Sequence, residues 1–520
     1  MTEDGLGRSA ARGAASTGVG VVVRIALQLV TVVLLARLLD EADFGLFAMV
    51  LAVIGVGELL RDAGLSSAAI QAPDLSARQR SNLFWSNTAI GLTLATLVLA
   101  GAPLVARLYG EPNLTAVTQA LSVTFLLNAM TTQYRASLVR AMRFTAVATI
   151  DVLAPATALV VAVVAAAAGA RYWALVTQQI VQAVVALVTC ATVGRWLPDP
   201  RWHRGQGMRR FFRFGGFLLG SQLIGYVANN IDNVLIGRQL GKDVLGVYSR
   251  GFQVLMNPLN QVRTPSTTVA LPALSRAGTG VQFDRIVRSG QLVLCYPITV
   301  GLGIVIGTAY PLVEVLLGPK WAGLPPILRL LAVAGAMQTI AYVGYWVYLS
   351  RGLTRQLMAY TTLTSVVKIV LVCLGAVWGF VGLGGEPLTD FFAGPPPDGS
   401  PGAVAWAPVA HSGAVGVAAG YALAATLEWP LSLWWLSRLT PLPTRALYGG
   451  AGRVLAIGSL VGLAAHGAVW ALDALPSWTQ VLAGAAAGAG VAAATTLVPR
   501  VRRDLGQLVH ALRVALSRRR

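Results

Sequence analysis

Hydrogen-bonding side chains crowd into an otherwise apolar stretch, YVANNIDNVLIGRQLG, at residues 226–241. They are Asn229, Asn230, Asp232 and Asn233, and Gln222 precedes them. At about 100° per residue, residues 222, 229 and 233 fall near one face of a helix, with residue 230 beside them. Amides at this spacing can line a hydrated cavity that binds a polar ligand, or they can satisfy one another where helices pack.

The next apolar run carries a second polar set, repeated at intervals of three and four residues. It comprises Arg250, Gln253, Asn257, Asn260 and Gln261. Residues 257, 260 and 261 share a helical face, and we expect Gln253 on the same face. So many amides would be costly against lipid, which favours the wall of a hydrated cavity.

Two charged sites lie earlier in the chain. Arg24 sits within the first apolar run, one turn before Gln28. A central arginine costs about 2.5–3.5 kcal/mol on insertion scales, so we expect it to contact a phosphate, to lock two halves of the protein by an ion pair, or to snorkel. Glu58, Arg61 and Asp62 close the second run and predict either a gate that locks two lobes or an ordinary helix-end salt bridge.

The elements that must position these residues follow from composition. The chain has 520 residues, of which 55% are hydrophobic and only 12% charged. Apolar runs of about 20 residues are long enough to cross a hydrocarbon core about 30 Å thick, and they must be helical because lipid offers backbone groups no partner. We therefore predict an all-α polytopic membrane protein with about fourteen transmembrane helices.

The basic residues behind the net charge of +19 are concentrated in particular connectors between the apolar runs. Arginines fill alternate connectors, as at residues 78 and 80 or 140 and 143, whereas the other connectors are acidic or nearly uncharged. This alternation predicts a protein of the cytoplasmic membrane with both termini in the cytoplasm, and it accounts for the charge without nucleic acid as a partner. The basic segment 501–520 is predicted to be an amphipathic cytoplasmic tail, lying on anionic lipid or frayed.

Sequence motifs for chemistry are missing. The chain contains no CxxC, HExxH or GxxxxGK[ST] pattern, so we expect no metal, no cofactor, no catalytic residue and no ATP hydrolysis by a P-loop. Energy for any movement would come from an ion gradient, from the membrane potential or from a downstream reaction. Lys368, Glu314 and Glu428 are further intramembrane charges and are candidates for such coupling.

An internal repeat relates the two halves of the chain. Without gaps, VLLARLLDEADFGLF at 33–47 aligns with VLIGRQLGKDVLGVY at 234–248, so that Arg37 matches Arg238 and Gly45 matches Gly246. Six predicted spans separate the copies, which indicates two six-helix lobes in a parallel repeat. The predicted organisation is an N-terminal cytoplasmic segment at 1–16, lobes at 17–200 and 201–440, an accessory helix pair at 441–500 and the tail at 501–520.

Several sequence blocks are similar to those of a known family of membrane proteins. They include LLARLLDEADFGLFAM (34–49), DAGLSSAAIQ (62–71), FWSN (84–87), LYGEP (108–112), RFGGF (213–217), NNIDNVLIGRQLGKDVLGVYSR (229–250) and ALPALSR (270–276). With these blocks the chain resembles the Wzx-like polysaccharide and lipopolysaccharide flippases of colanic-acid-exporter type. These belong to the multidrug/oligosaccharidyl-lipid/polysaccharide exporter superfamily. The resemblance is close over residues 15–290, and the Pro-rich loop at 381–402 departs from the family pattern.

The resemblance implies two helical bundles around a cavity that opens alternately to each side. Its substrate would be an undecaprenyl-diphosphate-linked oligosaccharide, and its partners would be membrane lipids, a polysaccharide polymerase and chain-length machinery. Alternatives are a lipid II-type or multidrug exporter of the same superfamily. A membrane glycosyltransferase using polyprenyl-phosphate sugars is another, with its acid among Asp40, Glu41 and Asp43.

Overall fold

Helices account for every regular element that the structure describes. In a computed structural model, the described residues are 22–62, 65–66, 69, 75–201, 203, 225–227, 229–278, 280–383, 401–502 and 506. Within these ranges, nine helices are long and apolar enough to cross a membrane. The predicted all-helical membrane fold is therefore confirmed, whereas the count of about fourteen spans stays a prediction.

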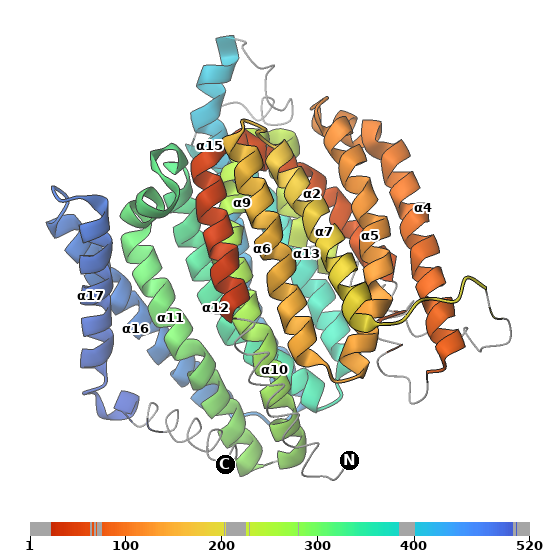
Figure 1. Cartoon of the computed structure of the whole chain (residues 1–520). Coiled ribbons are helices and arrows are strands. Elements are labelled where there is room, and N and C mark those ends of the chain that lie inside the picture. Colours follow the sequence, from red (N-terminus) through yellow and green to blue (C-terminus); the bar gives the residue numbers. More distant parts are fainter. Residues whose placement is uncertain are drawn as a thin grey trace. The chain divides into compact units, whose positions relative to one another are not determined.

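The chain divides into two compact units, Met1–Gly246 and Val247–Arg520. The first contains a helix at 22–38, then α2 (Glu41–Asp62), α4 (Ala77–Tyr109), α5 (Leu114–Arg140), α6 (Phe144–Ala167), α7 (Trp173–Gly194) and a helix at 229–239. Helices α4 to α7 run side by side (Figure 1), and α5 contacts α2, α4, α6 and α7. Helix α5 is thus the centre of this unit. The lobe boundary expected at 200–201 stays a prediction.

Local sequence explains how α4 begins and how it meets α5. Ser76 caps the helix reciprocally with Gln79, each side chain bonding the other residue's backbone N–H at 3.1 Å. The helix ends at Gly110, whose φ of 73° is the left-handed conformation that glycine adopts without strain. Along the shared face, a Cβ at Gly91 would lie 2.4 Å from that of Ala129. Glycine therefore lets the two helices approach closely.

The second unit holds the remaining helices. The end of α9 (Lys242–Gly251) leads into a π-helical turn, η1 (Phe252–Met256), and then into α10 (Asn257–Ala277), α11 (Val281–Leu317), η2 (Pro319–Trp321), α12 (Leu324–Ser350), α13 (Thr354–Trp378), η3 (Gly379–Leu383), α15 (Pro401–Leu439), α16 (Thr444–Ala471) and α17 (Ser477–Thr495). Helix α15 contacts α12 and α13, and α11 contacts α12, α16 and α17.

Small residues bring several of these helices into backbone contact. On α11, a Cβ at Gly303 would lie 2.4 Å from the carbonyl oxygen of Gly458, and one at Gly307 would lie 2.5 Å from that of Gly462. A second seam joins α13 to α15, where a Cβ at Gly416 would lie 1.9 Å from the oxygen of Gly375. Van der Waals packing between such faces is a main source of helix association in lipid.

Candidate functional site

The two copies of the repeat form the same local structure. The helix at 22–38 stops where the Leu39 N–H bonds the Leu35 carbonyl at 2.8 Å, and α2 starts at residue 41. At the same offset of 201 residues, the Leu240 N–H bonds the Ile236 carbonyl at 2.8 Å, and α9 starts at residue 242. We call these two helix breaks, residues 39–46 and 240–246, the corners.

The corners pack against each other through a reciprocal pair of glycines. A Cβ at Gly45 would lie 1.7 Å from the carbonyl oxygen of Lys242, and a Cβ at Gly246 would lie 1.9 Å from that of Glu41. Glu41 and Lys242 are themselves equivalent positions of the repeat. Only glycine permits this approach, which explains why this residue is identical in both copies.

Two ion pairs fasten the corners to neighbouring turns of the first unit. Lys242 Nζ lies 2.9 Å from Glu111 Oε1 in the turn between α4 and α5, and both side chains are at most one-fifth exposed. Arg171 Nε, in the turn between α6 and α7, lies 3.6 Å from Asp43 Oδ1. The Asp40 N–H also donates to Asp43 Oδ2 at 3.2 Å. Sequence reasoning had assigned no role to these two pairs.

The polar cluster of the 229–239 helix is partly satisfied by its own helix. Asn230 Nδ2 donates to the Tyr226 carbonyl at 2.9 Å, and Asn233 Nδ2 donates to Asn230 Oδ1 at 3.4 Å. Asp232 is buried and accepts the Asn233 N–H at 2.9 Å, whereas Asn229 is exposed. Gln222 lies outside the described residues. The structure thus brings residues 230 and 233 together, as the helical spacing predicts.

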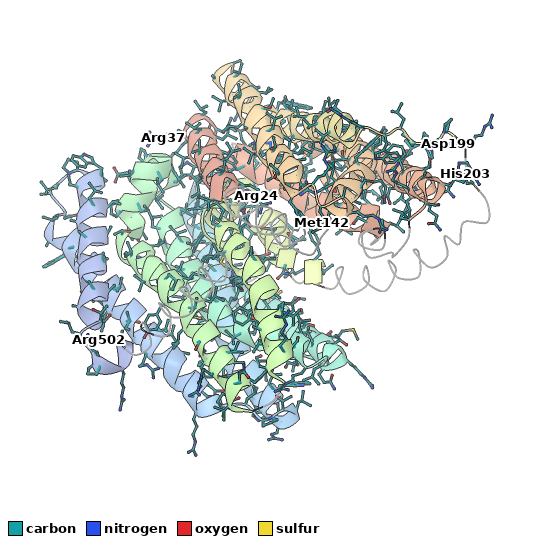
Figure 2. The ribbon with its side chains drawn as sticks, turned by 60° about the horizontal axis from the view of Figure 1, so that its bottom comes forward. Arg24, Arg37, Met142, Asp199, His203 and Arg502 are labelled. Atoms are coloured by element: carbon teal, nitrogen blue, oxygen red, sulfur yellow. The ribbon has the colours of Figure 1, made fainter. Side chains whose placement is uncertain are left out.

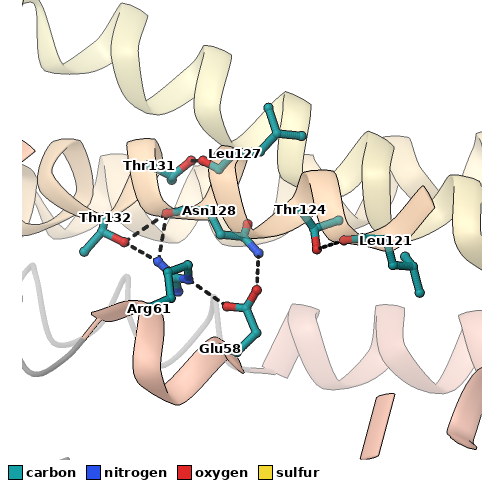
Figure 3. Close-up of polar contacts among 8 residues, drawn as sticks. All are labelled: Glu58, Arg61, Leu121, Thr124, Leu127, Asn128, Thr131 and Thr132. Carbon is teal, nitrogen blue, oxygen red and sulfur yellow. Dashed lines mark hydrogen bonds and ion pairs between the residues drawn. The ribbon is translucent and has the colours of Figure 1, made fainter. Parts of the chain in front are cut away.

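The charged residues predicted near the start of the chain have different environments. Arg24 and Gln28 are half-buried on the 22–38 helix, which also carries Arg37 nearer its other end (Figure 2). Arg61 Nε lies 2.8 Å from Glu58 Oε2, and its Nη1 donates to the Asn128 carbonyl at 2.9 Å and to Thr132 Oγ1 (Figure 3). Asn128 Nδ2 returns a bond to Glu58 Oε1 at 3.0 Å. The side chain of Asp62 lies outside the described part.

The network of Glu58 and Arg61 therefore joins α2 to α5 within one unit. It is more than the helix-end salt bridge that spacing alone suggests, because an arginine donates to α5 while an amide of α5 donates back. Its expected role as a gate or lobe lock stays a prediction.

In the second unit, the predicted polar set straddles the π-helical turn. Arg250 is buried before this turn, Gln253 lies within it, and Asn257 and Asn260 are exposed after it, with Gln261 half-buried. The spacing of these residues predicts a regular α-helix here. The π-turn carries extra residues per turn, so the register between residues 253 and 257 differs from the α-helical one.

A polar network that the sequence reasoning missed starts from the same helix. Arg263, only 3% exposed, donates to Asn260 Oδ1 at 3.0 Å and to Gln338 Oε1 at 3.3 Å. Gln338 Nε2 lies 2.9 Å from the Tyr421 hydroxyl oxygen, and Lys368 Nζ lies 5.3 Å from the centre of the Tyr421 ring. Four helices, α10, α12, α13 and α15, thus contribute polar side chains at one level of the second unit.

At the end of the first unit opposite the corners, the segment after α7 is fastened to the start of α4. Asn82 exchanges two hydrogen bonds with the backbone of His203, at 2.7 and 3.0 Å, and Trp85 Nε1 donates to the Asp199 carbonyl at 2.7 Å. Asp199 and His203 lie side by side, with His203 Nε2 2.9 Å from Asp199 Oδ2 (Figure 2). The Arg201 N–H and then the His203 ring hold the pKa of Asp199 below its usual range. The Asp199 carbonyl thus gives the Trp85 indole of the FWSN block a partner.

Known proteins share this fold. The chain aligns with the lipid II flippase MurJ in its inward closed conformation at a TM-score of 0.67 and 13% identity, covering 93% of this chain and 98% of that one. It also aligns with an inward-facing multidrug resistance MATE family transporter of the MOP superfamily, at a TM-score of 0.56 and 14% identity over 82% of this chain and 99% of that one. At such identities the likeness shows the fold of these transporters.

Relatives are also found by sequence. Teichuronic acid biosynthesis protein TuaB of Bacillus subtilis (strain 168) is 26% identical over 57% of this chain and 62% of its own length. Lipopolysaccharide biosynthesis protein WzxC of Escherichia coli (strain K12) is 26% identical over 63% and 67%, and succinoglycan biosynthesis transport protein ExoT of Rhizobium meliloti (strain 1021) is 29% identical over 60% and 63%. The chain thus spans about two thirds of the length of these relatives.

A family model described as polysaccharide biosynthesis protein matches residues 34–326, more than half of the chain. This stretch includes both corners, the Glu58 and Arg61 network, and Arg263. The chain therefore belongs to the polysaccharide biosynthesis protein family, as the Wzx-like sequence blocks predict, and it has the all-helical fold of the flippases and multidrug transporters to which it is similar.

Proposed function

We propose that this protein is a flippase that moves an undecaprenyl-diphosphate-linked oligosaccharide, a precursor of surface polysaccharide, from the inner to the outer leaflet of the cytoplasmic membrane. The observation that carries the proposal is the family match at 34–326 in a chain with the fold of a lipid II flippase. The work requires binding and reorientation and no covalent chemistry. Its partners would be the lipid-linked sugar, the surrounding lipids and the polymerase that consumes the product.

The distribution of charge supports an orientation. In the first unit, acidic side chains gather at the corner end, at residues 40, 41, 43 and 111, whereas arginines 78, 80, 140 and 143 lie at the opposite end. Because cytoplasmic connectors carry the excess of arginine and lysine, the arginine-rich end would face the cytoplasm. The corners would then lie on the outer side, and both termini of the chain in the cytoplasm.

The substrate-binding residues are proposed for each unit by itself. In the first unit they are Arg24, Gln28, Gln222, Asn229, Asn230, Asp232 and Asn233, and in the second unit they are Arg250, Gln253, Asn257, Asn260 and Gln261. Arg24 would contact the diphosphate, and the amides would bind the sugar hydroxyls. Exposed amide side chains at residues 229, 257 and 260 support this proposal, because exposed amides in a membrane helix favour contact with water or a polar ligand over contact with lipid.

Depletion of the protein tests the function. Lipid-linked oligosaccharide should accumulate in the inner leaflet while surface polysaccharide falls, as measured by lipid profiling and by surface staining. Accumulation of lipid II instead would identify the lipid II-type alternative. Normal surface polysaccharide after depletion, in a strain without a second exporter, would refute the proposal.

The role of Arg24 is tested separately. Arg24→Ala should abolish export at unchanged protein level, while Arg24→Lys should retain part of it, since lysine keeps the charge but loses the planar fork of donors. Arg37→Ala, an exposed position of the same helix outside the proposed cavity, is the matched control. Full export by Arg24→Ala would remove Arg24 from the site.

A further inference from the structure

Two cations and one acid meet in the interior of the second unit. Arg263 comes from α10, Lys368 from α13 and Glu428 from α15. Glu428 interacts electrostatically with both Lys368 and Arg263. Each of the three is an ionisable side chain on a helix of the membrane fold, where such groups are retained for function.

Tyr421 and Gln338 join the two cations. Gln338 Oε1 accepts from Arg263 at 3.3 Å, its Nε2 lies 2.9 Å from the Tyr421 oxygen, and the Lys368 ammonium lies 5.3 Å from the centre of the Tyr421 ring. Glu428 lies seven residues after Tyr421, two turns further along the same face of α15. Its backbone carbonyl accepts the Tyr360 hydroxyl at 2.8 Å. Direct contacts thus link the two cations through Gln338 and Tyr421, whereas Glu428 interacts with them through its charge.

The glycine seam between α13 and α15 fixes where this cluster lies. A Cβ at Gly420 would lie 2.1 Å from the Leu371 carbonyl oxygen, so the two backbones touch at that point. Lys368 is one turn before Leu371, and Tyr421 directly follows Gly420. The lysine therefore projects beside the tyrosine just where the contact seam begins, on two helices that cannot separate there without losing backbone contact.

The charge balance and the exposure indicate the ligand class. Two cations face one carboxylate, so the cluster repels a metal cation and retains an unbalanced positive charge that suits an anion. Arg263 is buried, yet the side chain that it bonds, Asn260, is exposed, and Gln338, Lys368 and Glu428 are half-buried. Arg263 Nε has no hydrogen-bond partner among the described residues. A phosphate oxygen that entered beside Asn260 could therefore accept a hydrogen bond from Arg263 Nε.

We propose that Arg263 and Lys368 form a binding site for the phosphate of an anionic ligand, and that Glu428 is the internal counterion that this phosphate displaces. The inference rests on the proposed function, because the diphosphate of a lipid-linked sugar would be that ligand. A phosphate bound by the two cations would take the place of Glu428 as their counterion.

Other titratable groups face the cluster and must be considered. Tyr342 on α12, Tyr421 on α15 and Cys295 on α11 lie within electrostatic range of Arg263, and Tyr360 on α13 lies near Glu428. All four are neutral in their ordinary state at neutral pH. Glu428 is therefore the acid of this cluster whose charge opposes an incoming phosphate.

The test measures binding of inorganic pyrophosphate to the purified full-length protein in detergent, by tryptophan fluorescence at constant ionic strength, at about pH 6 and about pH 8. Lys368→Gln should weaken binding about tenfold or more, as expected for the loss of one charged donor, and Lys368→Arg should restore it. Glu428→Gln should tighten binding at both pH values, because the amide removes the negative charge that opposes the phosphate. Comparing the two proteins at each pH removes the titration of pyrophosphate itself.

Two matched controls lie on the same unit. Asp473→Asn removes an exposed acid in the turn between α16 and α17, and Arg355→Gln removes an exposed cation from the first turn of α13. Neither should change the affinity for pyrophosphate by more than about twofold. Unchanged affinity in Lys368→Gln, or unchanged affinity in Glu428→Gln, would overturn the inference. Because this assay needs no transport, its failure is distinct from failure of the depletion experiment.

Discussion

Gly45 and Gly246, which are 201 positions apart, each lie against a backbone carbonyl of the opposite corner. The partner of Gly45 is Lys242, and the partner of Gly246 is Glu41, one helical turn before Gly45. The contact is therefore reciprocal, and it joins the two copies of a sequence repeat at the equivalent point of each. A conformational change that parts the corners must break both halves of this contact.

Replacing Gly246 by alanine should push the corners apart. The added Cβ would lie 1.9 Å from a backbone oxygen, which cannot rotate away as a side chain can. We expect a destabilisation of about 1–3 kcal/mol, seen as a lower unfolding midpoint of the purified protein, together with a loss of export. Gly101→Ala on α4, where no atom of another element lies within 4 Å of the new Cβ, should lower neither the unfolding midpoint nor export. An unfolding midpoint for Gly246→Ala equal to that of Gly101→Ala would contradict the contact.

Reversing the ion pair of Lys242 and Glu111 should be tolerated only in the double variant. Lys242→Glu or Glu111→Lys alone places like charges 2.9 Å apart, whereas the double reversal restores attraction. Because both side chains are largely buried, a double-mutant cycle on thermal stability should give a coupling of about 1 kcal/mol, at the upper end for partly exposed pairs. Additive losses would show that the pair contributes no coupling.

Removing Arg61 should loosen α2 from α5. Arg61→Met keeps the apolar stem but leaves Glu58, the Asn128 carbonyl and Thr132 Oγ1 without their shared donor (Figure 3). The expected cost is about 1–3 kcal/mol in the free energy of unfolding, because hydrogen bonds to charged groups are lost. Arg78→Met, an exposed residue in the first turn of α4, supplies the comparison and should be neutral. Equal stability of the two variants would exclude a structural role for the network.

Acid should release the segment that follows α7. The pKa of Asp199 is lowered, first by the Arg201 N–H and then by His203, so its stabilising effect is complete above the ordinary aspartate pKa of about 3.9 and is lost as pH falls through the lowered value. Asp199→Asn should therefore show fast amide exchange at residues 201 and 203 already at neutral pH, whereas the unaltered protein should show it only in acid. Protection of Asp199→Asn at neutral pH would argue against the carboxylate as the anchor.

Sequence periodicity predicted the helical class, the corners and the sharing of a helical face by Asn230 and Asn233. These features depend on local patterns, namely apolar runs, a repeat at fixed offset and spacings of three or four residues. Hydrogen bonds between Asn128 and Glu58, or between Gln338 and Tyr421, join residues 70 or 83 positions apart. Periodicity within one helix carries no information about which face of another helix it will meet.

The π-turn shows a second limit of prediction from the sequence. Nothing in FQVLM at 252–256 marks it, since its composition is that of an ordinary apolar helix. The α-helical register expected between Gln253 and Asn257 therefore differs from the one that the π-turn gives. Gly45 and Gly246 could be predicted only in part. The repeat identifies them as equivalent positions, whereas their carbonyl partners are visible only in the folded structure.

The corner contact has the form of an isologous interface, in which position i of one copy meets position j of the other, and j meets i. Two separate half-length chains related by a twofold axis would make the same contact with one glycine serving both sides. In a single chain the two copies can differ, and here they do. Asp43 is matched by Val244, and Asn229, Asn230, Asp232 and Asn233 are matched by Gln28, Leu29, Thr31 and Val32. The glycine contact is therefore symmetric while the side chains around it differ between the two copies.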